Sequence, residues 1–587
     1  MTDNYDSNKS AGNETNISKK LDLGPRWLRI AFWILIVLLG FVHAWADRHY
    51  LVNSDTMSYL DVADAYLRRD WQTAINSYWG PLYSWLIALA FLIVDPSPYW
   101  RFSVVHLINF AIYIFGFLCF DFMIRGVVQF QRHRRSIRPS VQFVTLPDWQ
   151  WVAFGYSLFI WSSLFLITMA LESPDLLVAS LVYLVVGLLL RIRQSPGSWT
   201  LFAFLGIALG FGYLAKAVMF PLSLIFLATS FLLVGSPKRA VPRFLLALVL
   251  FIVVAGPFVA SISLAKGRLT FGESGRLNYA WSTNDISQIH WQGEEPGNGV
   301  PAHATRKISA DPPIFEFAEP IGGTYPVWFD PTYWNEGITS QFNLRGQLRA
   351  FGLGIPVYYE LFFSKVQFGL LLTFITLFLL SGRRWKYLLD LAPYWFLILP
   401  SFAGLAAYSI ISVQARYTAP FLVLLWIAFF AGLRVPDSQE LRRVKTYIIT
   451  VLTVLIVFTV TASSYRETVV TLRSLVTGED VTAHEQWQVA QGLTQIGINE
   501  GDPVAVIGHS HRAFWAHLGG LKIVAEIDRR YVERFWTADS AVKSRALETF
   551  ASTGAKVVVV EKPPVGTVST GWIRIGNTDF YAYRLAG

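Results

Sequence analysis

Residues 53–72 read NSDTMSYLDVADAYLRRDWQ, a charged stretch that closely follows an apolar run from Trp27 to Ala46. The apolar run holds about twenty residues, enough for one helix to span the roughly 30 Å hydrocarbon core of a bilayer. Since it is not followed by a small-residue cleavage site after a short apolar core, we expect an uncleaved first span rather than a signal peptide. The charged stretch is therefore expected at the surface of a membrane.

The composition of the whole chain is that of a polytopic membrane protein. Of its 587 residues, 53% are hydrophobic and only 15% are charged, which is too apolar for one soluble domain of this length. The single cysteine, Cys119, excludes an intrachain disulfide and a cysteine metal cluster. Much of the basic content behind the net charge of +9 lies in short segments between apolar runs, a pattern typical of membrane topology rather than of nucleic-acid binding.

The apolar runs predict about eleven membrane helices, at residues 27–46, 100–124, 150–170, 174–192, 199–217, 218–235, 242–265, 361–381, 387–411, 417–433 and 446–464. The run at 81–94 is too short to span and is expected to lie at the interface or to re-enter the membrane. With that run excluded, five basic segments share the side of the N-terminus: 125–138, 191–193, 238–243, 383–386 and 434–445. The other, external side receives the loops at 47–99 and 266–360 and the C-terminal tail.

The expected organisation is a polar cytoplasmic N-terminus (1–26), a transmembrane domain (27–465) and an external soluble domain (466–587). The tail alternates strand-like and helix-like patterns, which predicts a small α/β fold. The expected strands are DPVAVIG, LKIVAEI, AKVVVVE, WIRIG and FYAYRL, and the expected helices are HEQWQVAQGLTQIG and DSAVKSRALETFASTG.

The opening stretch itself predicts a helix that starts near Ser54 and places Asp55 in its first turn, where the helix dipole favours a carboxylate. An apolar face at helical spacing is expected to lie on the membrane surface, formed by Tyr59, Val62, Ala63 and Tyr66. The opposite side is expected to be a solvated face with local ion pairs, formed by Asp61, Asp64, Arg68 and Arg69.

Four ordered motifs then carry a family resemblance: NSDTMSYLDVADAYLRRDW with YWGPLYSWL, LESPDLLVASLVYLVVGLLLR, GYLAKAVMFPLSL, and QARYTAPFLVLLW. Together they resemble the GT-C superfamily of integral membrane glycosyltransferases, in the style of the aminoarabinose transferase and protein O-mannosyltransferase group. The match covers roughly residues 25–265 and 360–435. It implies juxtamembrane helices in the first external loop. It also implies transfer of a sugar, with inversion, from a polyprenyl phosphate to a lipid, glycan or protein acceptor at the periplasmic face of a bacterial inner membrane.

The resemblance also implies roles for particular residues. Asp55 matches the family's first-loop acid and would be the general base. Lys216 would stabilise the charge of the leaving phosphate, as would Arg416 on a looser pattern, although both positions also suit a side chain that reaches to lipid headgroups. Tyr59 and Tyr83, which lie in the first motif, are assigned to substrate binding.

The second motif contributes two further acids. Asp175 lines up with the family's second acidic position, and with Asp55 it would bind a divalent cation or orient the acceptor; an ordinary helix start after Pro174 explains it equally well. Glu172 is a secondary candidate for substrate binding. A divalent metal ion is thus the one cofactor that the sequence leaves open.

The remaining candidates lie in the central loop and the tail. Aromatic residues of the loop would stack on a sugar ring or anchor a lid at the interface: Tyr325, Trp328, Tyr333 and Trp334. His290 and His303 lack the spacing of metal ligands, and the histidines of GHSHRAFWAH (His509, His511 and His517) are expected in an ordinary strand-to-helix loop.

A second class of function stays open, that of a transporter or lipid-handling protein without catalysis. Such a protein would use Asp55, Lys216 and Arg416 to bind a charged lipid. Transporters often contain internal repeats and polar groups near the membrane midplane. The sequence shows no such repeat, and its candidate polar groups gather at one side, so the enzyme is favoured.

Overall fold

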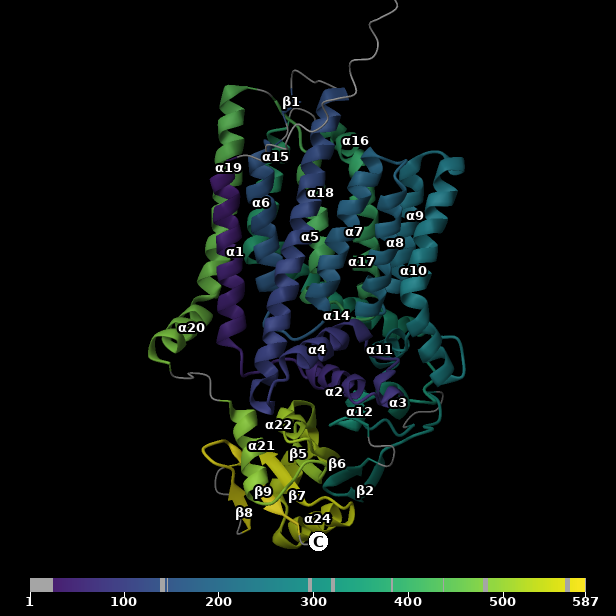
Figure 1. Cartoon of the computed structure of the whole chain (residues 1–587), viewed down its shortest axis with the longest axis vertical. Coiled ribbons are helices and arrows are strands. Elements are labelled where there is room, and N and C mark those ends of the chain that lie inside the picture. Colours follow the sequence, from purple (N-terminus) through teal and green to yellow (C-terminus); the bar gives the residue numbers. More distant parts are fainter. Residues whose placement is uncertain are drawn as a thin grey trace, which may run out of the picture.

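The computed structural model describes residues 25–137, 143–144, 146–293, 298–317, 322–381, 384–436, 438–478, 484–564 and 571–585. The predicted cytoplasmic segment 1–26 therefore lies almost wholly outside the described residues. Figure 1 shows a bundle of long helices with a smaller sheet domain at one end, the lower end in that view. Short helices lie between the two parts, where the candidate site is found.

Helices occupy all eleven predicted apolar runs: α1 (Arg26–Ala46), α5 (Arg101–Ile137), α6 (Asp148–Trp161), α7 (Asp175–Gln194), α8 (Trp199–Ala215), α9 (Met219–Val234), α10 (Pro237–Lys266), α15 (Lys365–Leu379), α17 (Trp395–Ser409), α18 (Ala415–Gly432) and α19 (Gln439–Ser463). Among the described residues, 7 helices are long and apolar enough to cross a membrane, or up to 8 if the bent pair Leu344–Phe363 and Val366–Leu379 is one span. The expected count of eleven is not confirmed, because α8 and α9 have only 17 and 16 residues, and α6 has 14 before a π-turn at residues 162–166.

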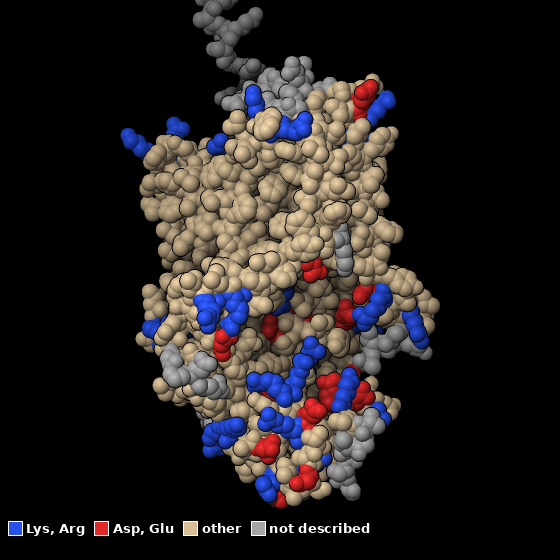
Figure 2. Space-filling view, turned by 180° about the vertical axis from the view of Figure 1, so that it is seen from behind, with Lys and Arg blue, Asp and Glu red and all other residues tan. Residues whose placement is uncertain are grey.

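The outer wall of the bundle is apolar. Large side chains such as Ile34 on α1, Val253 on α10 and Phe458 on α19 are exposed, and contact with lipid would cover them. On the face shown in Figure 2, a band of the bundle is almost free of charged residues; mostly Lys and Arg, with some Asp or Glu, lie at its upper end, and both signs of charge lie at its lower end and on the sheet domain. This distribution is the one expected of a polytopic membrane protein.

Three short helices lie across the lower end of the bundle: α2 (Asp55–Leu67), α3 (Trp71–Ala74) and α4 (Pro81–Val94). The run at 81–94 is thus a separate juxtamembrane helix. Gly80 allows this turn to approach the bundle closely, because a Cβ there would lie 2.6 Å from the carbonyl oxygen of Ala215, at the end of α8.

The expected solvated face of α2 is wrong for Asp61. Its side chain is buried, accepts hydrogen bonds from Thr324 N and Oγ1 at 2.7 and 2.8 Å, and pairs with Nδ1 of His517 at 2.8 Å. Asp64 pairs with Arg101 at 2.7 Å. The helix lies between α4 and the sheet domain, with Tyr59, Val62 and Ala63 also buried, so it does not rest on the membrane surface by one apolar face.

The lower domain is built on a seven-stranded sheet with the order β2-β3-β6-β5-β7-β9-β8. The three central strands, β6 (Lys522–Asp528), β5 (Pro503–Gly508) and β7 (Val557–Glu561), are parallel, and their apolar residues form its core. All five predicted strands are present, with β8 (Trp572–Arg574) and β9 (Phe580–Arg584) at one edge. The two expected helices are α21 (Glu485–Gln495) and α24 (Ser540–Ser552).

The sheet domain is not made from the tail alone. The central loop contributes β2 (Arg306–Ala310) and β3 (Pro313–Glu316), and β3 pairs antiparallel with β6. At the other boundary, α20 (Tyr465–Thr477) stays with the bundle, where Thr471 Oγ1 donates to the carbonyl oxygen of Val42 at 3.0 Å. The tail therefore joins the sheet only from α21 onward.

α14 (Leu344–Phe363), of 20 residues, is the first half of the bent pair named above. The other helices and strands are short: β1 (Phe143–Val144), α11 (Ser274–Thr283), α12 (Pro326–Phe329), α13 (Pro331–Trp334), α16 (Tyr387–Leu391), β4 (Val435–Pro436), α22 (Phe514–Leu518) and α23 (Val532–Thr537). Of these, α11, α12 and α22 approach α2 or the bundle end and shape the site described next.

Candidate active site

Four chain segments meet where the bundle ends. Asp55 opens α2 and Asp175 opens α7, and a carboxylate in the first turn of a helix is favoured by the exposed backbone N–H groups. Lys216 follows the last residue of α8, where a cation is favoured, and Arg416 lies in the first turn of α18. Three of these positions suit the helix dipole; Arg416 does not, and it lies against a carboxylate instead.

Asp175 is the centre of the cluster. One carboxylate oxygen, Oδ1, accepts a hydrogen bond from Lys216 Nζ at 2.6 Å, and Oδ2 lies 3.4 Å from Arg416 Nε. Ser173 Oγ also donates to Oδ2 at 2.9 Å. The side chain is only 3% exposed, so removing one partner would leave a buried charge unpaired. Asp175 therefore holds the two cations in place.

Asp55 stands at the open side of the same cluster. Its side chain is 22% exposed, Oδ2 lies 3.9 Å from Arg416 Nη2, and Oδ1 accepts a hydrogen bond from the indole of Trp328 at 3.2 Å. Burial raises the pKa of Asp55 above its ordinary value, and the nearby Arg416 and the Trp328 hydrogen bond oppose this shift. A carboxylate with free acceptor capacity and a raised pKa is suited to take a proton.

The two cations share an aromatic partner. Lys216 Nζ lies 3.7 Å from the centre of the Tyr417 ring, and Arg416 Nη2 donates to the Tyr417 hydroxyl at 2.9 Å. Both side chains keep some exposure, 26% for Lys216 and 18% for Arg416. They can therefore meet an anionic group that approaches from the bundle end, as the sequence motifs predicted for a phosphate.

The residues at this place do not fit a divalent metal held by Asp55 and Asp175. Both oxygens of Asp175 already face protein cations, and an ion there would lie beside Lys216 and Arg416. The contacts thus favour a role for Asp175 in holding Lys216 and Arg416 over the metal-binding role that its motif left open; the other expected role, orienting the acceptor, stays a prediction.

Glu172 does not line the site, contrary to its expected role as a substrate-binding residue. Its side chain is 0% exposed, and Oε2 accepts hydrogen bonds from the backbone N–H groups of Val52 and Asn53 at 3.2 and 3.1 Å. Thr56 donates to its backbone carbonyl at 3.0 Å. Burial raises the pKa of Glu172 to about 8. The residue fixes the turn that leads into α2 and so positions Asp55.

Tyr59 and Tyr83 are likewise core residues, not the substrate-binding residues that the first motif suggested. Their rings pack edge to face at 5.2 Å, and the hydroxyl of Tyr83 donates to Asn109 Oδ1 at 2.8 Å. Both side chains are buried, so they fix α2 against α4 and are closed to a ligand in this structure.

Of the four loop aromatics, Trp328 is the one that contacts the candidate base. Tyr325 and Trp334 are buried, and Tyr333 stacks on His303 at 3.8 Å. No sequence pattern around Trp328 indicated that its partner would be Asp55, 273 positions away in the chain. Its surroundings, a loop rich in aromatic residues, were the only available signal.

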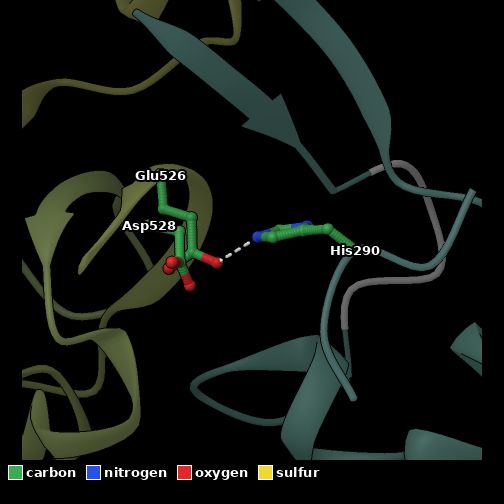
Figure 3. Close-up of side chains that lie close together, drawn as sticks. All are labelled: His290, Glu526 and Asp528. Carbon is green, nitrogen blue, oxygen red and sulfur yellow. Dashed lines mark hydrogen bonds and ion pairs between the residues drawn. The ribbon is translucent and has the colours of Figure 1, made fainter. Parts of the chain in front are cut away.

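A second polar cluster lies in the sheet domain. His290, Glu526 and Asp528 offer ligand atoms that all lie within 4.8 Å of one another (Figure 3). Glu526 already accepts hydrogen bonds from His290 Nε2 at 2.6 Å, from the Tyr325 hydroxyl at 2.7 Å and from Ser510. Because these donors occupy Glu526, the cluster is better explained as a buried hydrogen-bond network that joins the central loop to the sheet.

Known structures of two enzymes are similar to the chain. ArnT from Cupriavidus metallidurans in the apo state matches with 12% identity and a TM-score of 0.48 over 94% of this chain and 97% of that chain. The same protein bound to undecaprenyl phosphate matches with 12% identity and a TM-score of 0.46 over 95% and 98%. The oligosaccharyltransferase of Archaeoglobus fulgidus in complex with Zn and sulfate matches with 12% identity and a TM-score of 0.45 over 90% of this chain and 68% of that chain.

No protein-family model and no curated protein matches the chain.

Proposed function

We propose that the chain is an integral membrane glycosyltransferase of the GT-C type, which moves a sugar from a polyprenyl phosphate to an acceptor hydroxyl or amine. One observation carries the proposal: four distant segments bring Asp55, Asp175, Lys216 and Arg416 to the same bundle end. The cluster combines an accessible carboxylate with two partly exposed cations, which are the groups that this transfer needs.

In the proposed reaction, the acceptor oxygen or nitrogen attacks the anomeric carbon of the donor sugar. Asp55 takes the proton of the attacking group, the bond between the anomeric carbon and the phosphate oxygen breaks, and its electron pair stays on the lipid phosphate. Lys216 and Arg416 stabilise the charge that grows on that phosphate. A single displacement with one base inverts the configuration at the anomeric carbon.

Asp175 is a positioning residue in this scheme. It holds Lys216 and Arg416 within reach of one another, and it offsets their mutual repulsion in the resting site. Because two carboxylates balance two cations, the resting cluster carries no excess charge, and the donor phosphate then competes with the carboxylates for the same donors.

The proposed location is a bacterial inner membrane with the site on the periplasmic side. Support comes from basic side chains at the other end of the bundle, the upper end in Figure 2. Arg243 donates to the carbonyl oxygen of Gly197 at 3.1 Å, and Arg132 pairs with Asp148. These segments gather away from the site, as expected if they face the cytoplasm.

The test is transfer of labelled sugar from a panel of polyprenyl-phosphate donors by the full chain in lipid nanodiscs. The Asp55→Asn variant should lose about 10²- to 10⁴-fold in turnover while donor binding persists, since a general base contributes a factor of this size. Asp64→Asn is the matched control, because Asp64 lies on the same helix and pairs with Arg101 outside the cluster. Donor binding without turnover by the wild type across a fair range of acceptors would contradict the proposal and favour the lipid-handling alternative.

A further inference from the structure

A pocket of about 680 Å³ opens between the bundle end and the sheet domain. It lies at the carboxyl ends of the parallel strands β5 and β6, the edge at which open α/β sheets commonly bind ligands. The pocket is lined by Ser54, Ser287, Gln288, Ile289, Trp328, Gly508, His509, His511, Arg512, Glu526, Asp528, Arg529 and Arg530. Figure 2 shows charged side chains around the hollow between the two parts of the molecule.

This pocket adjoins the candidate base. Ser54, which lines it, precedes Asp55 in the chain, and the Trp328 indole that lines it donates to Asp55. The Trp328 ring also lies 5.1 Å from the ring of His511 on the sheet side. A molecule in the pocket would therefore touch a wall that reaches from the sheet domain to Asp55.

The accessible charge of the pocket is positive. Arg512 and Arg529 are exposed, and their guanidinium groups make no hydrogen bond or ion pair with the part of the chain that the structure describes. The acids are engaged: Glu526 is buried with its oxygens hydrogen-bonded, and Asp528 accepts from Arg530 Nε at 2.7 Å. Two arginines therefore remain available for a ligand.

The histidines of the pocket add no charge near neutral pH. Burial lowers the pKa of His511 to about 4, and burial with the nearby Arg529 and Arg512 also lowers the pKa of His509. Positive charge near pH 7 thus comes from guanidinium groups, which bind phosphate and carboxylate through paired N–H donors.

We propose that this pocket binds the acceptor through an anionic group, a phosphate or a carboxylate held by Arg512 and Arg529. Trp328 then directs the reacting hydroxyl or amine of the acceptor toward Asp55. The role in transfer rests on the proposed function, whereas binding of the anion does not. The sheet domain is in this way the acceptor-binding part of the molecule.

The first test measures binding of inorganic pyrophosphate to the full chain in phosphatidylcholine nanodiscs by calorimetry. Arg512→Gln and Arg529→Gln should each weaken binding about ten- to hundredfold, the effect of losing a charged hydrogen-bond partner. Arg545→Gln is the matched control, because Arg545 is an exposed arginine on α24 that does not line the pocket. Lys216→Gln should leave the affinity of the pocket for pyrophosphate unchanged. This variant also shows whether the cluster at the bundle end contributes to the measured binding.

Binding that is insensitive to both pocket arginines overturns the proposal. Two competitors then identify the source of the anionic group: a soluble sugar phosphate and an anionic phospholipid in the disc. At least one of them should displace pyrophosphate, and failure of both overturns the proposal. In transfer assays, Arg512→Gln and Arg529→Gln should raise KM for anionic acceptors, whereas the control Arg545→Gln should change neither KM nor kcat. Arginine-dependent binding without any transfer would refute the proposed function alone, whereas transfer without such binding would refute the acceptor pocket alone.

Discussion

The ion pair between Asp175 and Lys216 allows a quantitative test of how the cluster is held. Breaking a buried pair by removing one partner typically costs about 3–5 kcal/mol. Lys216 is 26% exposed, and Arg416 keeps a carboxylate partner in each variant, Asp175 in Lys216→Met and Asp55 in Asp175→Asn. We therefore expect about 2–3 kcal/mol for either variant. The double variant should cost less than the sum, because the charge of Lys216 is then removed together with its carboxylate partner, and Arg416 keeps Asp55 at 3.9 Å.

The assay is a double-mutant cycle on the free energy of unfolding, measured by reversible titration of the purified protein with a denaturing detergent. We expect a coupling energy of about 1–3 kcal/mol, in the range found for residues in direct contact. Asp285→Asn with Arg349→Met is the comparison pair, because these partners are exposed and their coupling should stay below about 1 kcal/mol. Additive effects at Asp175 and Lys216, within about 0.5 kcal/mol, would refute the buried pair as the element that holds the cluster.

Three further predictions concern single sites. Because the pKa of Asp55 is raised, kcat/KM should fall with decreasing pH around an apparent pKa above the ordinary aspartate value; a limb at or below that value in a pH-rate profile would contradict this. Glu172 has its pKa raised from 4.5 to about 8, so its proton stabilises the fold at low pH and that contribution is lost as pH rises through 8. Glu172→Gln should therefore flatten the decline of the melting temperature between about pH 4.5 and 8, and an equal decline in the variant would contradict this. Asp61→Ala removes the partner of Thr324 and His517, and should loosen the sheet domain from α2, seen as faster proteolysis between the two parts.

Local patterns explain what the sequence could predict. Hydropathy and basic segments decide which helix ends share a side of the membrane, and so they place Asp55, Asp175, Lys216 and Arg416 at one bundle end. The strands of the tail follow from apolar runs such as VAVI and VVVV, which predict a strand without knowledge of the strand that pairs with it. The cluster of the candidate site was thus largely within reach of sequence reasoning.

Contacts between distant segments explain what could not be predicted. The spacing of α2 indicated one apolar face and left Asp61 for solvent, because a periodic pattern does not show that a second domain covers the polar face with His517. The same limit hid the Trp328 hydrogen bond to Asp55 and the two strands that the central loop adds to the sheet.

The mixed origin of that sheet has a consequence for biosynthesis. During translation β3 is synthesised about two hundred residues before β6, the strand with which it pairs. Over that interval the hairpin of β2 and β3 has an unpaired strand edge, and several membrane helices must insert before the edge is covered. The sheet domain can therefore close only after residues 503–584, which carry its other strands, have been synthesised, and this couples maturation of the extramembrane part to completion of the bundle.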